Sequence, residues 1–318
     1  MWPLLVILAF LSSSTHVSSS ETRSESYISA DGGYRIVGGE AYNGTALGFI
    51  VSLKIRQYNY HVCGGALVAE SWSITAGHCA SAIMAGPLDI VVGILKLSEP
   101  GDRYEVEKIV VHPYFNITTL LNDLALVKTI DPVKVTDKVH PIRLAEADFF
   151  VGPGIYVELF GWGMTKFPNG TAPDHVQSIR LRTITNSECN GRYRGTPVPL
   201  IEMSQLCTFN QIGQGSCRGD SGGPLISQNI LMAIVSFGVP CGAGYPDVHT
   251  RISFHRSWID HVMVSDPDGL TVPPQTTTTT FQPTTSSCTT EDDTTTDELS
   301  TEEPNSKENN IVTTEKTS

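Results

Sequence analysis

The chain has 318 residues, of which 40% are hydrophobic and 17% are charged. At roughly 100–200 residues per domain, this length allows one large domain or two small ones, with tails. No apolar run reaches the roughly 18–20 residues of a membrane-spanning helix, which argues against an integral membrane protein. The formal net charge of -12 is opposite to the basic balance that phosphate neutralisation requires, so we expect no nucleic-acid partner.

Most of the negative charge lies at the C-terminal end. Residues 266–318 contain 11 acidic and 2 basic residues, and residues 271–318 contain 17 threonines. Such a segment has too little apolar surface to offset the entropy lost when a chain becomes ordered. We therefore expect 266–318 to be a disordered, Thr-rich acidic tail. It is either an inert spacer or a stalk that tethers the protein to mucin, matrix or another chain.

A secretory signal is expected in residues 1–20. The apolar run Met1–Leu11 is too short to span a membrane, and serines and a threonine follow it at once. Three Asn-x-Thr sequons, at Asn43, Asn116 and Asn169, are candidate N-glycosylation sites. Together these features predict a secreted, extracellular glycoprotein.

The seven cysteines are Cys63, Cys79, Cys189, Cys207, Cys217, Cys241 and Cys288. None of them forms the C-x-x-C spacing of a zinc or redox site. In an oxidising compartment the first six can form three disulfides, for which 15 pairings exist. Cys288 lies in the tail and either pairs between molecules or stays free. The histidines are scattered and no H-E-x-x-H is present, so we expect no metal and no other cofactor.

Between Ile36 and Val264, short β-rich runs alternate with Gly, Pro and Asn, a spacing typical of an all-β sandwich or barrel. One core-packing helix is expected over Ser253–Val264, where apolar residues recur at helical spacing. The expected strands are Phe49–Ile55, Gly65–Val68, Ile90–Leu95, Lys108–Val111, Leu124–Thr129, Ile155–Phe160, Val176–Thr183, Pro224–Ile226, Leu231–Phe237 and Val248–Ile252.

Three short motifs could together form a nucleophilic site. They are Thr75-Ala-Gly-His-Cys79, Asn122-Asp-Leu-Ala-Leu126 and Gly219-Asp-Ser-Gly-Gly-Pro224. A serine hydroxyl becomes an effective nucleophile when a base takes its proton and a third group orients that base. Ser221, His78 and Asp123 would supply nucleophile, base and orienting group. Each motif alone is more often structural, but the three in this order are far more specific.

On these motifs the segment from Ile36 to Val264 resembles the chymotrypsin/trypsin family of serine endopeptidases. The resemblance implies an all-β fold of two six-stranded antiparallel β-barrels, with the active site between them and a C-terminal helix. It implies a protease domain over 36–265 that hydrolyses protein or peptide substrates. It also implies that the N–H groups of Gly219 and Ser221 form the oxyanion hole.

The resemblance further pairs the cysteines, in a three-disulfide pattern like that of invertebrate members. The first pair would hold the loop of His78, and the third would brace the specificity pocket behind Ser221. Gly161-Trp-Gly163 also matches a family signature, which we interpret as structural. The implied pairs are Cys63–Cys79, Cys189–Cys207 and Cys217–Cys241.

Arg35-Ile-Val-Gly-Gly39 resembles the activation site of the family. A protease that cuts after Arg35, either a separate activator or the enzyme itself, would free an α-ammonium group on Ile36. That cation would bury itself beside Asp220, because a buried carboxylate is costly unless a cation joins it. Residues 21–35 would then be an activation propeptide.

The expected specificity pocket departs from the commonest patterns. By resemblance Gly215 lies at its floor, where trypsins have Asp, while Asp247 lies on its back wall, where the family usually has Gly. His249, where the family usually has Tyr, is two residues from Asp247 and shares its face of a strand, so we expect the two side chains to touch. Alternatively, Asp247 points away and the pocket is open and apolar.

Ser236-Phe237-Gly238 resembles the strand that pairs with the substrate backbone, with Phe237 in place of the usual Trp. Gly238 leaves the mouth of the pocket open, which disfavours elastase-like specificity. Arg218, just before the oxyanion glycine, favours acidic residues beyond the scissile bond. We predict a broad, chymotrypsin-like specificity for large side chains, with some acceptance of Lys and Arg. The alternative function is a catalytically silent binding protein on the same fold, against which the complete triad argues.

Overall fold

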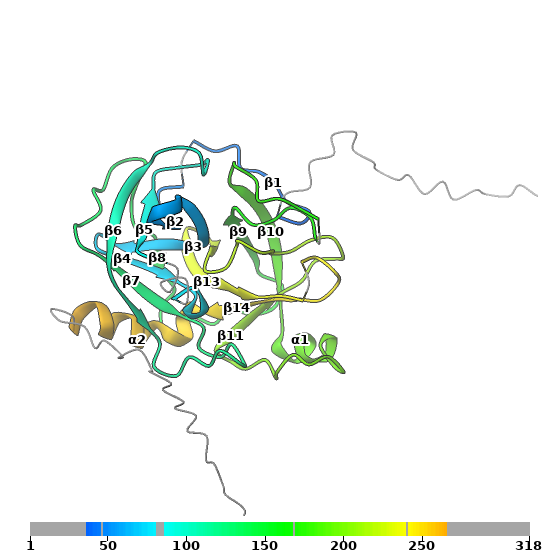
Figure 1. Ribbon diagram of the computed structural model, residues 1–318. Helices are drawn as coiled ribbons and strands as arrows, with labels where there is room; N and C mark the ends of the chain where they lie inside the picture. Colours follow the sequence, from blue (N-terminus) through cyan, green and yellow to red (C-terminus); the bar gives the residue numbers. More distant parts are fainter. Residues whose placement is uncertain (1–35, 46, 81–85, 168, 240, 266–318) are drawn as a thin grey trace, which may run out of the picture. The chain divides into compact units, whose positions relative to one another are not determined.

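The computed structural model describes residues 36–45, 47–80, 86–167, 169–239 and 241–265. The expected signal, propeptide and tail, with Arg35 and Cys288, lie outside these residues. The described part forms two six-stranded antiparallel β-barrels followed by a C-terminal helix, which confirms the expected fold class (Figure 1). Within these ranges, no helix combines the length and the apolar character needed to cross a membrane.

The first barrel closes in the strand order β2-β3-β4-β7-β6-β5. β2 and β5 are buried along their whole length, which explains why their sequences are nearly continuous apolar runs. β6 instead carries charged, exposed residues over its first half, so the sequence predicted only its end. The bounds are β2 Ile50–Ile55, β3 Tyr60–Ala69, β4 Trp72–Thr75, β5 Leu88–Val92, β6 Asp102–Val111 and β7 Ala125–Thr129.

The second barrel closes because β9 pairs with both β10 and β12, which completes the ring β9-β10-β11-β14-β13-β12. Two short strands join its sheet: β1 pairs with β10, and β8 runs parallel to β13. The bounds are β1 Glu40–Ala41, β8 Arg143–Leu144, β9 Tyr156–Gly161, β10 Gln177–Ile184, β11 Gln205–Thr208, β12 Pro224–Ser227, β13 Ile230–Phe237 and β14 Asp247–Arg251.

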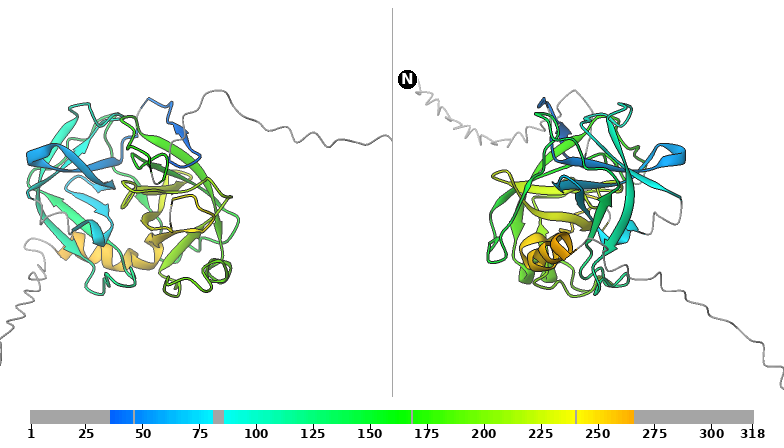
Figure 2. Two further views of the ribbon diagram at one scale, coloured as in Figure 1. Left: turned by 45° about the vertical axis from the view of Figure 1, so that its right-hand side comes forward. Right: turned by 90° about the vertical axis from the view of Figure 1, so that its left-hand side faces the viewer.

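Helical segments complete the described chain, and residues 77–80, which include His78, form a 3-10 turn after β4. A 3-10 turn, η1 (Arg56–Tyr58), joins β2 to β3, and α1 (Asn186–Arg192) begins where the Thr185 side chain accepts a hydrogen bond from the N–H of Glu188. The expected C-terminal helix is α2 (Ile252–Ser265), which contacts β8 and β13. In the left view of Figure 2, α2 leaves the second barrel and runs beneath the first.

The two barrels share one core. The largest cluster of buried hydrophobic side chains combines Ile50 and Ile74 of the first barrel with Leu159 and Leu225 of the second. Loops that meet at the junction of the barrels are therefore anchored on a common packed interior.

Candidate active site

The three candidate catalytic residues come from both barrels. His78 follows β4 and Asp123 precedes β7 in the first barrel, whereas Ser221 precedes β12 in the second. The N–H of Gly64 on β3 donates to the carbonyl of Ser221 at 2.8 Å, which ties the Ser221 loop to the first barrel.

Gly222 explains how closely the two barrels approach beside Ser221. Its φ is +75°, and a Cβ there would lie 2.1 Å from Thr75 Oγ1, three residues before His78. Thr75 Oγ1 itself donates to the carbonyl of Gly64 at 2.8 Å. Only glycine satisfies both the left-handed backbone and this contact, so the Ser221 loop packs directly against the segment that leads into His78.

Asp123 is fully buried and accepts three hydrogen bonds. Its Oδ1 accepts from the backbone N–H of His78 at 2.8 Å, and its Oδ2 accepts from His78 Nδ1 at 2.8 Å and from Ser236 Oγ at 2.6 Å. Thr250 Oγ1 donates to the Asp123 carbonyl at 2.7 Å. When His78 Nδ1 donates its hydrogen bond to Asp123, the basic nitrogen of the ring is Nε2. The His78 side chain is 24% exposed.

The structure contains the three disulfides that the family resemblance implies. Cys63–Cys79 links β3 to the residue after His78, Cys189–Cys207 links α1 to β11, and Cys217–Cys241 spans the segments on both sides of the pocket described below.

The expected oxyanion hole has free donors. In the described part of the chain, the N–H groups of Gly219 and Ser221 have no hydrogen-bond acceptor. The Gly219 carbonyl accepts from His61 Nε2 at 3.1 Å, and His61 Nδ1 lies 2.8 Å from Ser52 Oγ. Burial lowers the pKa of His61 to about 4, so its neutral ring donates to Gly219 and accepts from Ser52. His61 was not predicted from the sequence, because its partners Gly219 and Ser52 are distant in the chain.

Asp220, beside Ser221, is fully buried among backbone groups. Its Oδ1 accepts from the N–H of Gly163 at 2.8 Å and its Oδ2 from the N–H of Cys217 at 2.9 Å. A Cβ on Gly161 or Gly163 would lie 2.2 Å from a carboxylate oxygen, so the Gly-Trp-Gly motif makes the space that this side chain fills. Burial raises the pKa of Asp220 to about 7, although both backbone hydrogen bonds oppose the shift.

The segment after the expected cleavage point is packed into the same region. Ile36 is fully buried, and the carbonyl of Val37 accepts from the N–H of Gly215 at 3.0 Å. The residue that would carry the new amino terminus is therefore already inside the protein, next to the segment that leads to Ser221.

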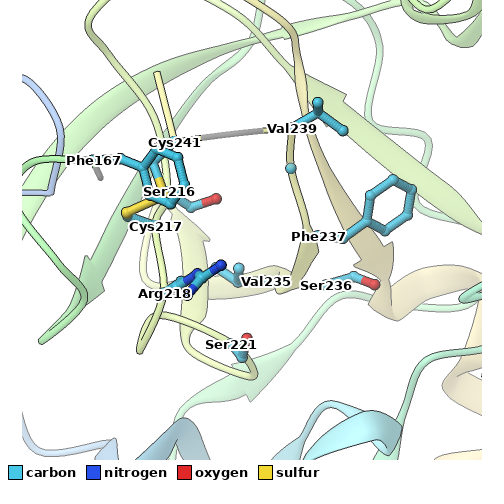
Figure 3. Close-up of a pocket in the computed structure, with 11 residues that line it drawn as sticks. Phe167, Ser216, Cys217, Arg218, Ser221, Val235, Ser236, Phe237, Val239 and Cys241 are labelled. Atoms are coloured by element: carbon cyan, nitrogen blue, oxygen red, sulfur yellow. A yellow bond between two sulfur atoms is a disulfide. The ribbon is translucent and has the colours of Figure 1, made fainter. Parts of the chain in front are cut away.

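A cavity of about 380 Å³ opens beside Ser221. In Figure 3, residues 216–218 form one wall, residues 235–239 form the other, and Ser221 lies at the lower edge. The guanidinium of Arg218 stacks over Phe167 at 5.4 Å from its ring centre, at the mouth of this cavity. The lining residues are Phe167, Ser216, Cys217, Arg218, Ser221, Val235, Ser236, Phe237, Gly238, Val239 and Cys241.

The carboxylate of Asp247 lies behind this cavity. A Cβ on Gly215 would be 2.5 Å from Oδ2 and one on Gly238 would be 2.7 Å from Oδ1, so both glycines are needed to accommodate it. Oδ2 accepts from the N–H of Ser216 at 2.7 Å. Desolvation raises the pKa of Asp247 to about 7; hydrogen bonds from Ser216 oppose this shift and the charge of Asp220 adds to it.

The prediction that the side chains of Asp247 and His249 are in contact is wrong. The ring of His249 is fully buried, its Nε2 lies 2.8 Å from Thr208 Oγ1, and its Nδ1 has no hydrogen-bond partner among the described residues. Thr208 pairs with Asp247 across β11 and β14, so the threonine takes the place beside the histidine that we expected the carboxylate to fill. Burial lowers the pKa of His249 to about 3.

Two other groups of candidate residues can be placed. The sequon residues Asn43, Asn116 and Asn169 are all exposed. In the described ranges, the ligand atoms of Cys63, His78 and Cys79 lie within 4.8 Å of one another, but both sulfur atoms belong to a disulfide and offer no thiolate.

The family model named Trypsin matches residues 36–259 of this chain. Chymotrypsin-2 of Vespa crabro is 32% identical over 70% of the chain and 98% of the relative, and Trypsin 5G1 of Aedes aegypti is 33% identical over 72% and 85%. The Vitellin-degrading protease of Bombyx mori is 34% identical over 72% and 86%. The chain therefore belongs to the trypsin family and is a serine endopeptidase of the chymotrypsin/trypsin type.

Proposed function

We propose that this protein is a secreted endopeptidase that hydrolyses peptide bonds with Ser221 as nucleophile, His78 as base and Asp123 as orienting group. The observation that carries the proposal is the buried Asp123 carboxylate, which accepts from His78 Nδ1 at 2.8 Å and so fixes the tautomer in which Nε2 is the basic nitrogen. The alternative, a catalytically silent binding protein, is not favoured because the relatives compared above carry protease names.

The proposed reaction follows from these positions. His78 Nε2 takes the Ser221 hydroxyl proton while Oγ attacks the substrate carbonyl carbon. The charge that develops on the carbonyl oxygen is stabilised by the N–H groups of Gly219 and Ser221, typically by about 3 kcal/mol for a donor of this kind. His78 then gives its proton to the leaving amine, and water hydrolyses the acyl ester by the same steps in reverse.

Secretion is supported by three disulfides and by the exposure of all three sequon asparagines. We propose residues 1–20 as the signal peptide and 21–35 as the activation propeptide. We keep two roles open for the tail, an inert spacer or a tether to mucin, matrix or another chain.

Activation by cleavage after Arg35 is supported by the burial of Ile36 and by the environment of Asp220. The Asp220 carboxylate has two N–H donors but a pKa near 7, so its charged form is poorly compensated in the uncleaved chain. An α-ammonium group on Ile36 would supply the missing positive charge. We propose that this pairing orders the segment around Gly219 and the specificity pocket.

The proposed specificity depends on Asp247. The cavity is lined mainly by apolar and small residues, which suits large side chains such as Phe, Tyr and Leu. Asp247 places a carboxylate between Gly215 and Gly238, where it would attract Lys or Arg when ionised. We therefore propose a broad, chymotrypsin-like specificity whose acceptance of basic residues depends on the charge of Asp247.

Two variants, compared with wild type, test the catalytic and activation proposals. Wild type, Ser221→Ala and Arg35→Gln are purified uncleaved, treated with a trace of trypsin, freed of it, and assayed on a diverse peptide mixture. Wild type should cut peptides, Ser221→Ala should lose at least about 10³-fold in kcat, and Arg35→Gln should stay uncleaved and inactive. Equal activity of Ser221→Ala and wild type would overturn the triad; full activity of uncleaved Arg35→Gln would overturn the activation step.

The Asp220 environment predicts a pH-dependent stability of the uncleaved chain, measured on a Ser221→Ala background to prevent self-cleavage. Between about pH 4 and pH 7 only the folded state holds the Asp220 proton, so the free energy of unfolding falls as pH rises through this window. This pH-dependent loss of stability should be absent in Asp220→Asn, because its amide does not titrate. Relative to its parent, Asp220→Asn should gain about 4 kcal/mol between pH 4 and pH 8 in urea unfolding.

The exposed Asp148→Asn serves as the matched control and should show no such gain. After cleavage at Arg35, Asp220→Asn should be less stable than its parent, because its neutral amide cannot pair with the ammonium group of Ile36. The same pH slope in Asp220→Asn and its parent would contradict the burial argument.

The specificity proposal predicts that pH changes the preference at the residue before the scissile bond. Two peptide substrates that differ only in Arg or Phe at that position are compared by kcat/KM from pH 5.5 to 8.5. Because Asp247 ionises near pH 7, the Arg/Phe ratio should rise with pH in wild type and should be low and flat in Asp247→Gly. Asp148→Gly should behave as wild type. A flat wild-type ratio would exclude the proposed role of Asp247.

A further inference from the structure

A cluster of aromatic and imidazole side chains lies behind Asp123, away from the substrate cavity. His255, on α2, is 2% exposed, and its ring meets the edge of His112 at 5.2 Å between ring centres. The ring of Trp258 also packs against His112, with 4.7 Å between the ring centres. Asn122, the residue before Asp123, joins this cluster through its side chain, which contacts His255 directly. The reaction proposed above makes no use of these groups.

Both nitrogens of His255 face hydrogen-bond acceptors. Nδ1 lies 2.8 Å from the carbonyl oxygen of Arg251, and Nε2 lies 3.1 Å from Asn122 Oδ1. The amide of Asn122 is oriented by its other end, because its Nδ2 donates to the carbonyl of Tyr114 at 3.0 Å. The chain of contacts from Arg251 through His255 and Asn122 to Tyr114 therefore contains three hydrogen bonds.

A neutral imidazole cannot complete this chain, because it has one N–H and must accept with its other nitrogen. If Nδ1 carries the proton, Nε2 faces Asn122 Oδ1 without a hydrogen between them. Rotating the Asn122 amide so that Nδ2 faces Nε2 restores that hydrogen bond. It then places Oδ1 opposite the carbonyl oxygen of Tyr114, and two acceptors face each other. If Nε2 carries the proton instead, the contact with Arg251 is lost. Each neutral arrangement makes two of the three bonds, and only the imidazolium makes all three.

We propose that His255 is a positioning residue for the catalytic aspartate, and that protonation of its ring completes a hydrogen-bond chain that fixes Asn122 and thereby Asp123. The inference rests on the role proposed above for Asp123. It concerns a residue that touches neither substrate nor the reacting atoms.

The local backbone explains why Asn122 transmits the effect. Asn122 and Leu120 both have φ of +53°, a left-handed conformation that is unfavourable for a leucine. The N–H of Leu124 donates to the Asn122 carbonyl at 2.8 Å, directly across Asp123. When the bond from Asn122 Nδ2 to Tyr114 is lost, the strained turn before Asp123 loses the side-chain contact that holds it.

The surroundings of His255 disfavour its protonated form but do not prevent protonation. Desolvation lowers the pKa of His255, while its bond to the Arg251 carbonyl raises it. The facing groups that titrate or carry charge are His112 and Tyr114 from the β6–β7 connection, Asp123 beyond Asn122, and Arg251 and Arg256 beside His255 in the chain. His112 is held neutral, since burial lowers its pKa to about 4 and its Nδ1 accepts from the N–H of Tyr114 at 3.3 Å. The chain should therefore be completed as pH falls below the ordinary histidine range.

The test compares activated wild type with His255→Gln, a neutral side chain that cannot titrate. A peptide with Phe before the scissile bond avoids any effect of Asp247 charge, and pH effects common to both enzymes cancel in the ratio of their kcat values. The ratio of kcat, wild type over variant, should rise about threefold to tenfold from pH 8 to pH 5, as one added hydrogen bond implies. KM should not change. His261→Gln, an exposed histidine of the same helix, should give a flat ratio.

An independent NMR titration follows the His255 imidazole in wild type and should detect its protonation as pH falls below the ordinary histidine range. It involves no catalysis, so it can fail separately from the proposed triad. A flat kcat ratio for folded His255→Gln, or a ring that stays neutral to pH 4, would overturn the inference. If His255→Gln does not fold, Asn122→Gly keeps the left-handed backbone, breaks the same chain, and must show the same pH-dependent ratio.

Discussion

The arrangement of the site depends on one buried carboxylate. Asp123 has no exposed surface, so it needs hydrogen-bond donors on both oxygens to offset its desolvation. The first barrel supplies the N–H and ring of His78, and the second supplies the hydroxyl of Ser236. Because these donors belong to different barrels, satisfying this carboxylate fixes the position of one barrel against the other at the cleft.

Strand β3 connects this constraint to the proposed nucleophile. His61 holds the Gly219 carbonyl, Gly64 holds the Ser221 carbonyl, and Cys63 is bonded to Cys79 beside His78. Two residues of this strand, His61 and Gly64, thus orient the loop that precedes β12 of the second barrel, and Cys63 fixes the residue after His78. A strand fixed by pairing on both sides is a rigid support for this purpose.

The sequence predicted the architecture well wherever burial leaves a pattern. Each expected strand overlaps an observed one, and the helix expected over Ser253–Val264 is α2. The short strands β1, β4, β8 and β11, of two to four residues each, were missed because they are too short to show a clear period. His61 and His255 were missed for a different reason. A lone histidine in an apolar segment is indistinguishable from core until its hydrogen-bond partners, distant in sequence, are known.

Asp247 shows both the strength and the limit of such reasoning. The sequence located its carboxylate near the pocket, but the two-residue period could not reveal that Thr208 on the neighbouring strand already contacts His249. What decides the direction of the Asp247 side chain is the empty volume over Gly215 and Gly238. A glycine acts here through the space that its missing side chain leaves, and a sequence does not show which neighbouring side chain fills that space.

The second barrel contains two further buried carboxylates, and they differ from Asp123 in how they are compensated. Asp123 has three donors, one of them an imidazole that can become cationic, whereas Asp220 is held by two backbone N–H groups and Asp247 mainly by Ser216. Burial raises the pKa of both carboxyls to about 7, because these hydrogen bonds offset their desolvation only in part. In the function proposed here, each deficit is met by a cation that arrives later: the amino terminus of Ile36 for Asp220, and a basic substrate side chain for Asp247. Activation and substrate choice then rest on the same physical device, an under-compensated carboxylate that stabilises whatever positive charge reaches it.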